Sequence, residues 1–281
     1  MKISVACLFM VLVFAASSFA NSILVEENTF PPKYHFGYYG LLQASIYGTT
    51  YGPGYTEKPA SGISFQYNQE FYFGWEKDTV VRLGLPVYFG IPTDADPEAS
   101  SSGLFDLGIK VQRLLHHETD STPSASVLIM GRAPSQDYRS GFGYGYGRAG
   151  IMGVLEKTMG AVETRFNAGY VYTFPYQEKN GPVPKNIDPG DRIQLNLGIE
   201  TPFTHRVNLN YEIISEFIFC DMVEGVVQPG SDAVVVTNLV ALNYELRESS
   251  YLFAGVQFPL YIRQCRGTSA IIPMAGLYYE F

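Results

Sequence analysis

A short glycine pattern is the feature of this sequence most suggestive of a binding site. The stretch 145–150 reads GYGRAG, which matches the dinucleotide-binding sequence G-x-G-x-x-G. In a nucleotide site such glycines follow a buried strand and open a helix whose N-terminus holds the pyrophosphate. Here the chain turns directly into the strand-like segment 161–174, AVETRFNAGYVYTF, with no room for a helix. We interpret Phe142, Tyr144 and Tyr146 instead as a membrane-interface girdle whose glycines face inward or toward a neighbouring strand.

Charged residues at alternate positions are the second candidate for chemistry. In segment 161–174, Phe166 and Tyr170 fall on one face, and Glu163 and Arg165 on the other. Such alternation marks a strand with two different environments. The pattern is clear in 61–73, 161–174, 193–200 and 206–219, and weaker in 34–47, 79–89, 103–115, 123–133, 145–157, 233–244, 250–261 and 270–281. It predicts about twelve strands of roughly 9–14 residues, close to the length of membrane strands.

The connections between these strands alternate in length. The short ones are 75–78, 116–122, 158–160, 201–205 and 247–250, and the long ones are 48–60, 90–102, 134–144, 175–190, 220–232 and 262–269. Short periplasmic turns and longer outer loops are typical of outer-membrane barrels. A soluble β-sandwich, which is the alternative fold, gives no reason for this sorting.

Both ends of the chain favour a bacterial outer-membrane protein. Residues 1–20 have the charge, apolar run and small residues of a secretory signal peptide. We expect 21–33 to be a periplasmic N-terminal segment or plug, and 34–281 to be the barrel. Phe281 ends a strand with alternating apolar residues, which resembles the C-terminal signal read by the barrel assembly machinery. The predicted fold is an all-β, transmembrane, antiparallel up-and-down β-barrel of about 12 strands, in contact with outer-membrane lipids and lipopolysaccharide.

Composition narrows the function classes. Aromatic residues make up 15% of the chain and charged residues 16%, whereas soluble domains carry about 25% charged residues. The net charge of −8 argues against a nucleic-acid partner. After the signal peptide, no segment has the apolar length of a membrane helix.

Charges on the strands must face the barrel interior, because each would cost about 2–4 kcal/mol toward lipid at the membrane midplane. The residues that we predict to line the lumen are Glu70, Arg82, Asp106, Lys110, Arg132, Arg165, Glu200, Glu212 and Glu216. Two hypotheses follow. Arginines and carboxylates pair across the lumen and fill it, or they line a narrow polar path.

Other reactive residues give weaker signals. The four histidines lie at predicted periplasmic ends, so a Ser–His enzyme lacks a base near the outer rim. We predict no catalytic residue, no metal site and no cofactor. Cys220 and Cys265 fall in two predicted outer loops, where they form either a disulfide or two free thiols.

A resemblance to a known family starts at 103–115, GLFDLGIKVQRLL. The residues that carry it are Gly103, Asp106 and Leu107, the strand SVLIMGRAP ending at Pro134, and Asn167, Gly169 and Tyr170. Over about 100–175 the chain resembles the outer-membrane proteins named for the meta-pathway of phenol degradation. The resemblance implies a barrel that passes small hydrophobic or aromatic compounds, and it implies no catalytic residues.

The sequence thus leads to three hypotheses. The first is a narrow channel or transporter for small molecules. The second is a structural or adhesive surface barrel with a closed lumen, which binds partners through its outer loops. The third, which we rank lowest, is a lipid-modifying outer-membrane enzyme.

Overall fold

The structure is a computed structural model that describes residues 31–51, 57–90, 102–134, 145–178, 184–247, 250–263 and 267–281. Every regular element in these ranges is a β-strand. The described residues hold no helix with the length and apolarity needed to cross a membrane. The predicted signal peptide and most of segment 21–33 lie outside the described residues, and both remain predictions.

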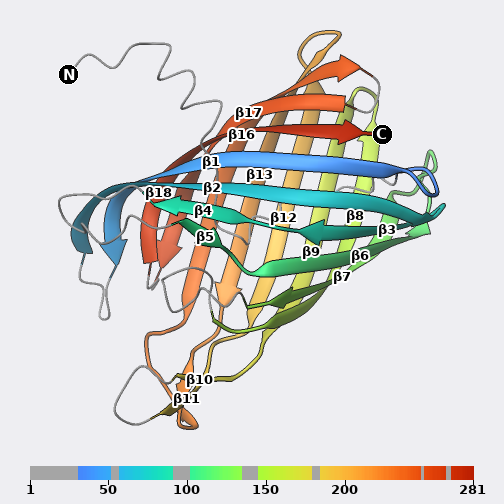
Figure 1. Ribbon diagram of the computed structural model, residues 1–281. Helices are drawn as coiled ribbons and strands as arrows, with labels where there is room; N and C mark the ends of the chain where they lie inside the picture. The colour runs from blue at the N-terminus through green and yellow to red at the C-terminus, as the bar shows by residue number, and fades with distance from the viewer. Residues whose placement is uncertain are drawn as a thin grey trace, which may run out of the picture.

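Twelve antiparallel strands form one closed β-barrel (Figure 1), which confirms the predicted fold. In chain order they are β1 (Phe36–Tyr51), β2 (Glu57–Glu76), β3 (Thr79–Gly84) continued by β4 (Val87–Gly90), β5 (Ser102–Leu104) continued by β6 (Leu107–His116), β7 (Ser124–Ala133), β8 (Arg148–Met159), β9 (Val162–Thr173), β12 (Arg192–Pro202), β13 (Val207–Ile218), β16 (Ala233–Arg247), β17 (Ser250–Arg263) and β18 (Gly267–Glu280). β1 pairs with both β2 and β18, and this pairing closes the sheet.

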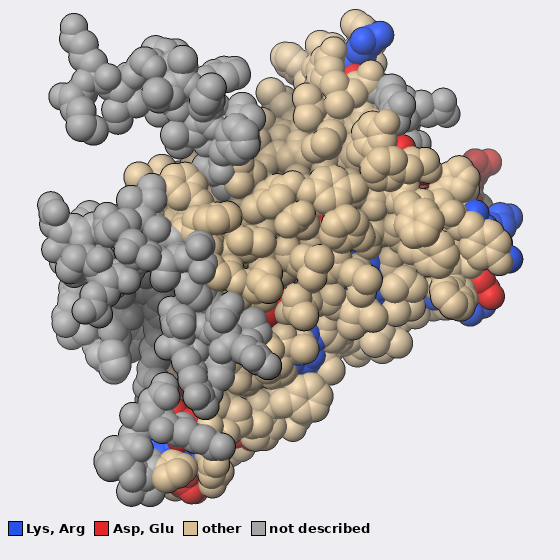
Figure 2. All heavy atoms as spheres, in the orientation of Figure 1, with Lys and Arg blue, Asp and Glu red and all other residues tan. Residues whose placement is uncertain are grey.

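Side chains alternate between the two faces of the wall because successive Cβ atoms of a strand point in opposite directions. On β9 the outer Phe166 and Tyr170 are 43% and 42% exposed, whereas the inner Arg165 and Asn167 are 3% and 0% exposed. On the wall that faces the viewer in Figure 2, charged atoms are few and gather mainly at the right-hand end of the barrel. The outward face is therefore apolar over most of its height and most charges of the strands lie inside, whereas Arg113 and Lys157 share the outward face near the turns that join β6 to β7 and β8 to β9.

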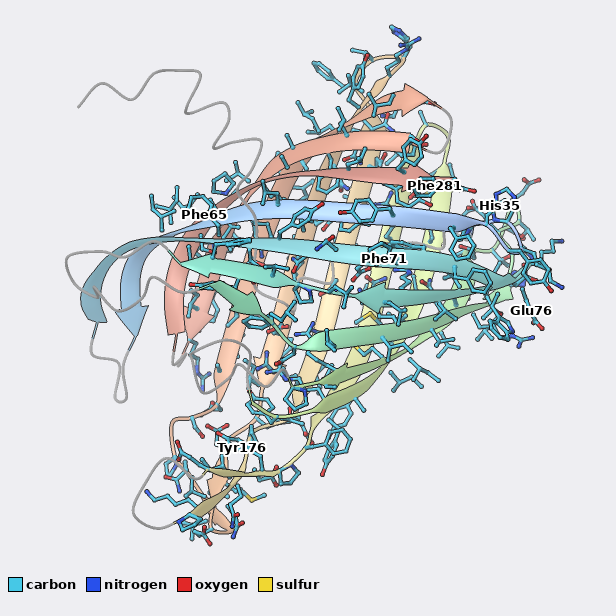
Figure 3. The ribbon with its side chains drawn as sticks, in the orientation of Figure 1. His35, Phe65, Phe71, Glu76, Tyr176 and Phe281 are labelled. Carbon is cyan, nitrogen blue, oxygen red and sulfur yellow. The ribbon has the colours of Figure 1, made fainter. Side chains whose placement is uncertain are left out.

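All the short connections lie at one end of the barrel, here called the short-turn end. Each predicted short connection overlaps a gap between two consecutive strands at this end. Figure 3 shows His35, Glu76 and Phe281 gathered there. The Phe281 N–H donates to the Phe36 carbonyl oxygen at 2.9 Å, so the last residue of the chain is fixed beside the first strand.

Two predicted long loops are mostly strand. β1 and β2 extend into the predicted loop 48–60, and β17 and β18 extend into the predicted loop 262–269. Backbone pairing continues there, for example between Tyr51 and Glu57. Backbone pairing does not require apolar residues, so the polar, Gly/Pro-rich composition of these stretches concealed the strand ends.

Two predicted strands are each interrupted once, between β3 and β4 at Leu85–Pro86 and between β5 and β6 at Phe105–Asp106. Proline has no N–H to contribute to a β-ladder, which explains the first break. The Leu85 N–H donates to the Gln69 carbonyl oxygen at 2.8 Å, and the Phe105 N–H donates to the Pro86 carbonyl oxygen at 2.9 Å. These bonds hold the wall together across both breaks.

Four short strands form a second sheet at the lower left of Figure 1, here called the outer lobe. They are β10 (Tyr176–Glu178), β11 (Lys185–Asp188), β14 (Met222–Val223) and β15 (Val226–Val227). They arise from the predicted loops 175–190 and 220–232. The sequence did not predict them, since pieces of two to four residues are too short to show a period.

A pair of glycines tests how the N-terminal residues dock on the short-turn end. A Cβ at Gly74 would lie 2.3 Å from the Pro32 carbonyl oxygen, whereas a Cβ at Gly108 meets nothing within 4 Å. We expect Gly74→Ala to lower barrel stability by about 1–3 kcal/mol through overpacking. The measurement is the temperature at which the folded band disappears in unheated versus heated gels. Gly108→Ala is the control and should leave that temperature unchanged; equal shifts for both variants would contradict the docking.

Candidate channel through the barrel

A cavity of about 520 Å³ occupies the interior of the barrel. Its lining reaches from Tyr251 and Glu280 at the short-turn end to Arg132, Arg148 and Arg192 at the outer ends of β7, β8 and β12. This volume lies within the range of about 300–1,000 Å³ that is usual for small-molecule sites.

An arginine and three carboxylates form a cluster near the short-turn end, here called the Arg165 cluster. Arg165 is 3% exposed, and its guanidinium lies 2.6 Å from Glu163, 2.7 Å from Glu200 and 3.9 Å from Glu156. Asn208 donates to the second oxygen of Glu200 at 2.7 Å. A buried charge is tolerated only when it is paired and hydrogen-bonded, and these contacts supply both.

The middle of the lumen carries a second polar network. The Lys110 ammonium lies 2.9 Å from Glu70. Arg82 donates to the Gln112 side-chain oxygen at 2.5 Å, and Gln112 donates to the Ser126 hydroxyl at 2.8 Å. The Arg82 guanidinium also lies over the ring of Tyr72, 5.0 Å from its centroid. The chain of contacts joins β2, β3, β6 and β7 along their inner faces.

Three arginines line the cavity at the outer ends of β7, β8 and β12, here called the outer arginine group: Arg132, Arg148 and Arg192. Arg192 lies 3.3 Å from Glu216, whose other oxygen accepts from Gln194 at 2.6 Å. Asp106, which is 1% exposed, lines the same cavity.

Two apolar clusters occupy opposite arcs of the inner wall. One lies on β1, β16 and β18 and comprises Leu41, Leu239, Ala241, Ile272 and Met274, with Tyr39 and Phe253 packed against it. The other lies on β7 and β8 and comprises Leu128, Met152 and Val154, with Met130 packed against it. In the strand order the two are separated by β2–β6 on one side and by β9–β13 on the other. The Lys110–Glu70 pair lies on the first of these arcs, and Arg165, Glu163 and Glu200 lie on the second, whereas Arg132, Arg148 and Glu156 share β7 and β8 with the second apolar cluster.

The ion pairs of Arg165, Arg192 and Lys110 follow the wall. Arg165 pairs within β9 and with the adjacent strands β8 and β12, and Arg192 on β12 pairs with the adjacent β13. Lys110 on β6 reaches Glu70 on β2, with only β3 between them. These pairs neutralise charge within one strand or between strands that are adjacent or one strand apart, and they do not connect opposite arcs.

Eight of the nine predicted lumen residues line the cavity, namely Glu70, Arg82, Asp106, Lys110, Arg132, Arg165, Glu200 and Glu212. Glu216 contacts the cavity through Arg192. The predicted set lacked Arg148 and Arg192. Arg192 shares the face of Gln194, so extending the alternation of 193–200 back by one residue would have found it. The inward apolar residues were also missed, because alternation had assigned apolar side chains to the outside.

The glycine pattern opens strand β8 and no helix follows it. Gly145 has a φ of 74°, a backbone conformation that glycine adopts without strain. The girdle interpretation is wrong for Tyr146, whose hydroxyl accepts from Arg148 at 2.9 Å and whose ring stacks on Tyr176 of the outer lobe at 5.3 Å. The ring is held by the lumenal arginine and the lobe. Phe142 and Tyr144 lie outside the described residues.

The other predicted reactive residues do not gather into a site. Cys220 lies 3.8 Å from Asp232, and Cys265 lies outside the described residues, so the choice between disulfide and free thiols remains open. His116 contacts Thr122 at 2.8 Å and His117 lies 3.4 Å from Asp78, both at the short-turn end. Among the described residues, no group of three or more His, Cys, Asp or Glu side chains could hold a metal ion.

Comparison with solved structures places this fold among outer-membrane barrels. The COG4313 outer-membrane channel from Pseudomonas putida F1 matches 91% of this chain and 98% of its own, with a TM-score of 0.73 and 12% identity. The NanC porin matches 88% of this chain and 100% of its own (TM-score 0.55, 9% identity). The β-domain of the Bordetella autotransporter Brka matches 89% and 100% (TM-score 0.50, 11% identity). No protein-family model and no curated protein matches the chain, and the link to phenol degradation remains a prediction.

We predict that the stability of the barrel depends strongly on Arg165, the cation of the Arg165 cluster. Arg165→Met leaves three carboxylates without their partner, and breaking a buried ion pair costs about 3–5 kcal/mol. We expect the heat-modifiable gel transition to fall sharply at pH 7.5 and to recover partly at pH 4, because protonated carboxylates no longer repel one another.

The matched control is Lys157→Met, which removes a cation that pairs with Glu118 at 3.0 Å near the short-turn end. This pair is more exposed, and exposed ion pairs contribute little. If both variants lower the transition temperature equally, or if Arg165→Met does not recover at low pH, the ion pairs of Arg165 do not stabilise the barrel.

Proposed function

We propose that the protein is a narrow channel of the bacterial outer membrane for small molecules with an apolar or aromatic part. The observation that carries the proposal is the course of three ion pairs beside the cavity. Lys110–Glu70, Arg165–Glu200 and Arg192–Glu216 each run along the wall, and the lining of the cavity extends from the outer arginine group to Glu280. Pairs that crossed the lumen would support a filled barrel instead.

The lining supports a solute of mixed character. Apolar Leu41 and Leu239 line the cavity together with charged Lys110 and Glu212. Tyr39 and Phe253, which also line it, stack with centroids 5.4 Å apart. A purely polar pore has no use for such residues, because apolar surface in contact with water is unfavourable. The predicted contacts with lipopolysaccharide, outer-membrane lipids and the barrel assembly machinery belong to this proposal.

A surface barrel that binds a partner through its outer lobe is the second candidate. Val226 and Val227 of β15 are 63% and 52% exposed, and exposed apolar residues on a lobe are suited to contact another molecule. This function does not need a passage through the lumen, so conductance separates it from the channel. The third hypothesis, a lipid-modifying enzyme, gains no support, since the described histidines lie at the short-turn end.

Conductance in planar bilayers tests the channel. We expect the refolded protein to form small, steady channels in a salt gradient. Glu212→Gln should shift the reversal potential toward anion preference, because it removes a negative charge from the lumen wall.

Glu224→Gln is the control, since Glu224 is an exposed residue of the outer lobe, and it should leave the reversal potential unchanged. Absence of channels in the unmodified protein, together with absence of benzyl alcohol and benzoate uptake into liposomes, would reject the channel and favour the surface barrel.

A further inference from the structure

The inner faces of β12 and β13 carry hydrogen-bond acceptors that lack a donor. Gln194, Asn196 and Asn210 each keep a buried side-chain oxygen that accepts no hydrogen bond from any described residue. The amide nitrogens of Gln194 and Asn210 donate to Glu216 at 2.6 Å and to Glu212 at 3.2 Å, which fixes these two oxygens on the other side of the amide. A buried acceptor without a donor costs about 1–3 kcal/mol. This part of the wall is therefore suited to a ligand that brings N–H donors.

Asn210 is the point at which these acceptors meet the cavity. It lines the cavity and is 6% exposed. Its direct cross-strand partners are Glu200 on β12 and Ala241 on β16, and both also line the cavity. Directly opposite residues of a sheet have Cβ atoms about 4.5–5.5 Å apart. A solute beside Asn210 is thus within reach of the carboxylates of Glu200 and Glu212.

The inner faces of β9, β12 and β13 are negatively charged. They carry four carboxylates and two arginines, which gives a net charge of −2: Glu163, Glu200, Glu212 and Glu216, with Arg165 and Arg192. On the flanking strands, Arg148 and Glu156 of β8 cancel, and β16 adds Glu245, the direct partner of the cavity-lining Tyr251. The field of this arc attracts a cation.

The rest of the cavity does not reverse this preference. The facing strands β2–β7 carry three cations and two carboxylates on the lining: Arg82, Lys110 and Arg132, with Glu70 and Asp106. At the outer end, the three arginines lie with Asp106, Glu216, Asp188, Asp191 and Asp221. Asp191 accepts from the Thr173 N–H at 2.8 Å and Asp221 from the Gly190 N–H at 3.0 Å. Neutral donors leave both charges in place, so the outer end does not repel a cation.

An apolar wall begins on the strand beside these acceptors. Ala241 and Leu239 of β16 are the direct partners of Asn210 and Glu212. Both belong to the first apolar cluster, against which Phe253 packs, and all three line the cavity. The wall therefore changes from acceptors and carboxylates to apolar side chains between one strand and the next. A solute with a cationic group on β13 would place its carbon body on β16 and β17.

We infer that this stretch of the lumen is a binding site for small primary amines that carry an apolar body. An ammonium group has three N–H donors and a positive charge. It donates to the Asn210 oxygen beside Glu212, which keeps its contacts within the wall and contributes its charge. Leu239 and Phe253 contact the apolar body. The inference names a solute class for the proposed channel and rests on that function only for its purpose, since binding itself needs no transport.

Equilibrium dialysis of the folded protein tests the site with three probes, in nonionic detergent at pH 7.5 and fixed ionic strength. Benzylamine has both parts, benzyl alcohol lacks the charge and methylamine lacks the ring; micelles alone correct for partition. We expect benzylamine to bind at least about tenfold more tightly than either of the others, because only benzylamine uses both the acceptors and the apolar wall. Equal binding of benzylamine and benzyl alcohol, or of benzylamine and methylamine, overturns the inference.

Two variants locate the ammonium group. Asn210→Leu removes the acceptor and nearly keeps its shape, and Glu212→Gln removes the charge; each should weaken benzylamine binding about tenfold and leave benzyl alcohol unchanged. The controls are Asn238→Leu and Glu224→Gln, which should have no effect. Asn238 follows the outward face of β16 and accepts from the Tyr211 hydroxyl at 2.9 Å, and Glu224 lies in the outer lobe. Retained benzylamine binding in both lumenal variants overturns the site.

A further variant locates the apolar body. Leu239→Gln should weaken benzylamine binding and leave methylamine binding unchanged, because only benzylamine has a ring to place on β16. Heat-modifiable gel mobility confirms that each variant folds. Unchanged benzylamine binding in Leu239→Gln overturns the assignment of the apolar wall.

The two proposals fail separately. Benzylamine binding by a protein that forms no channels and admits no solute refutes the channel and leaves the amine site in place. Channels in a protein that binds benzylamine no better than benzyl alcohol refute the site and leave the channel in place.

Discussion

Closure of the sheet is the constraint on which the rest of this structure depends. In hydrocarbon each unsatisfied backbone N–H or C=O costs several kcal/mol, so a spanning sheet cannot leave an edge. The pairing of β1 with both β2 and β18 removes that edge. Closure also determines the environment of every side chain on the strands, because a residue of a closed sheet faces either lipid or lumen. The charges of the strands then have only the lumen available, and they must find partners there.

Those partners are close in the sheet, and this is why the barrel can be charged inside without being filled. Arg165 and Glu200 stand on adjacent strands at nearly the same level, since Gly198 is the direct partner of Arg165. Because the two charges of each pair lie close together on the wall, their attraction offsets the free-energy cost of removing them from water. Pairs that follow the wall leave room for the cavity beside them, whereas the same residues placed on opposite arcs would bridge the lumen.

Period-2 alternation was enough to predict the barrel, because the pleat and the lipid act on every strand in the same way. It also brought Arg82, Lys110 and Glu212 to the lumen. It could not predict the inward Leu41 and Leu239, whose apolar character matches either face. It also missed the outer lobe and the contact of Tyr146 with Arg148, since both depend on residues distant in the sequence and on strands too short to show a period.

The opposite placement of the two apolar clusters gives the lumen an uneven cross-section. Under the proposed function, a solute with a flat apolar body would lie against Leu41 and Leu239 on one arc or beside Met130 on the other, and its polar group would stay near Lys110 or Arg132. A uniformly polar wall would hold water all around the solute and offer no place for the body. A uniformly apolar wall would leave the polar group of the solute without a hydrogen-bonding partner. Under the proposed function, alternating arcs would keep both parts of such a solute in favourable contact along the cavity.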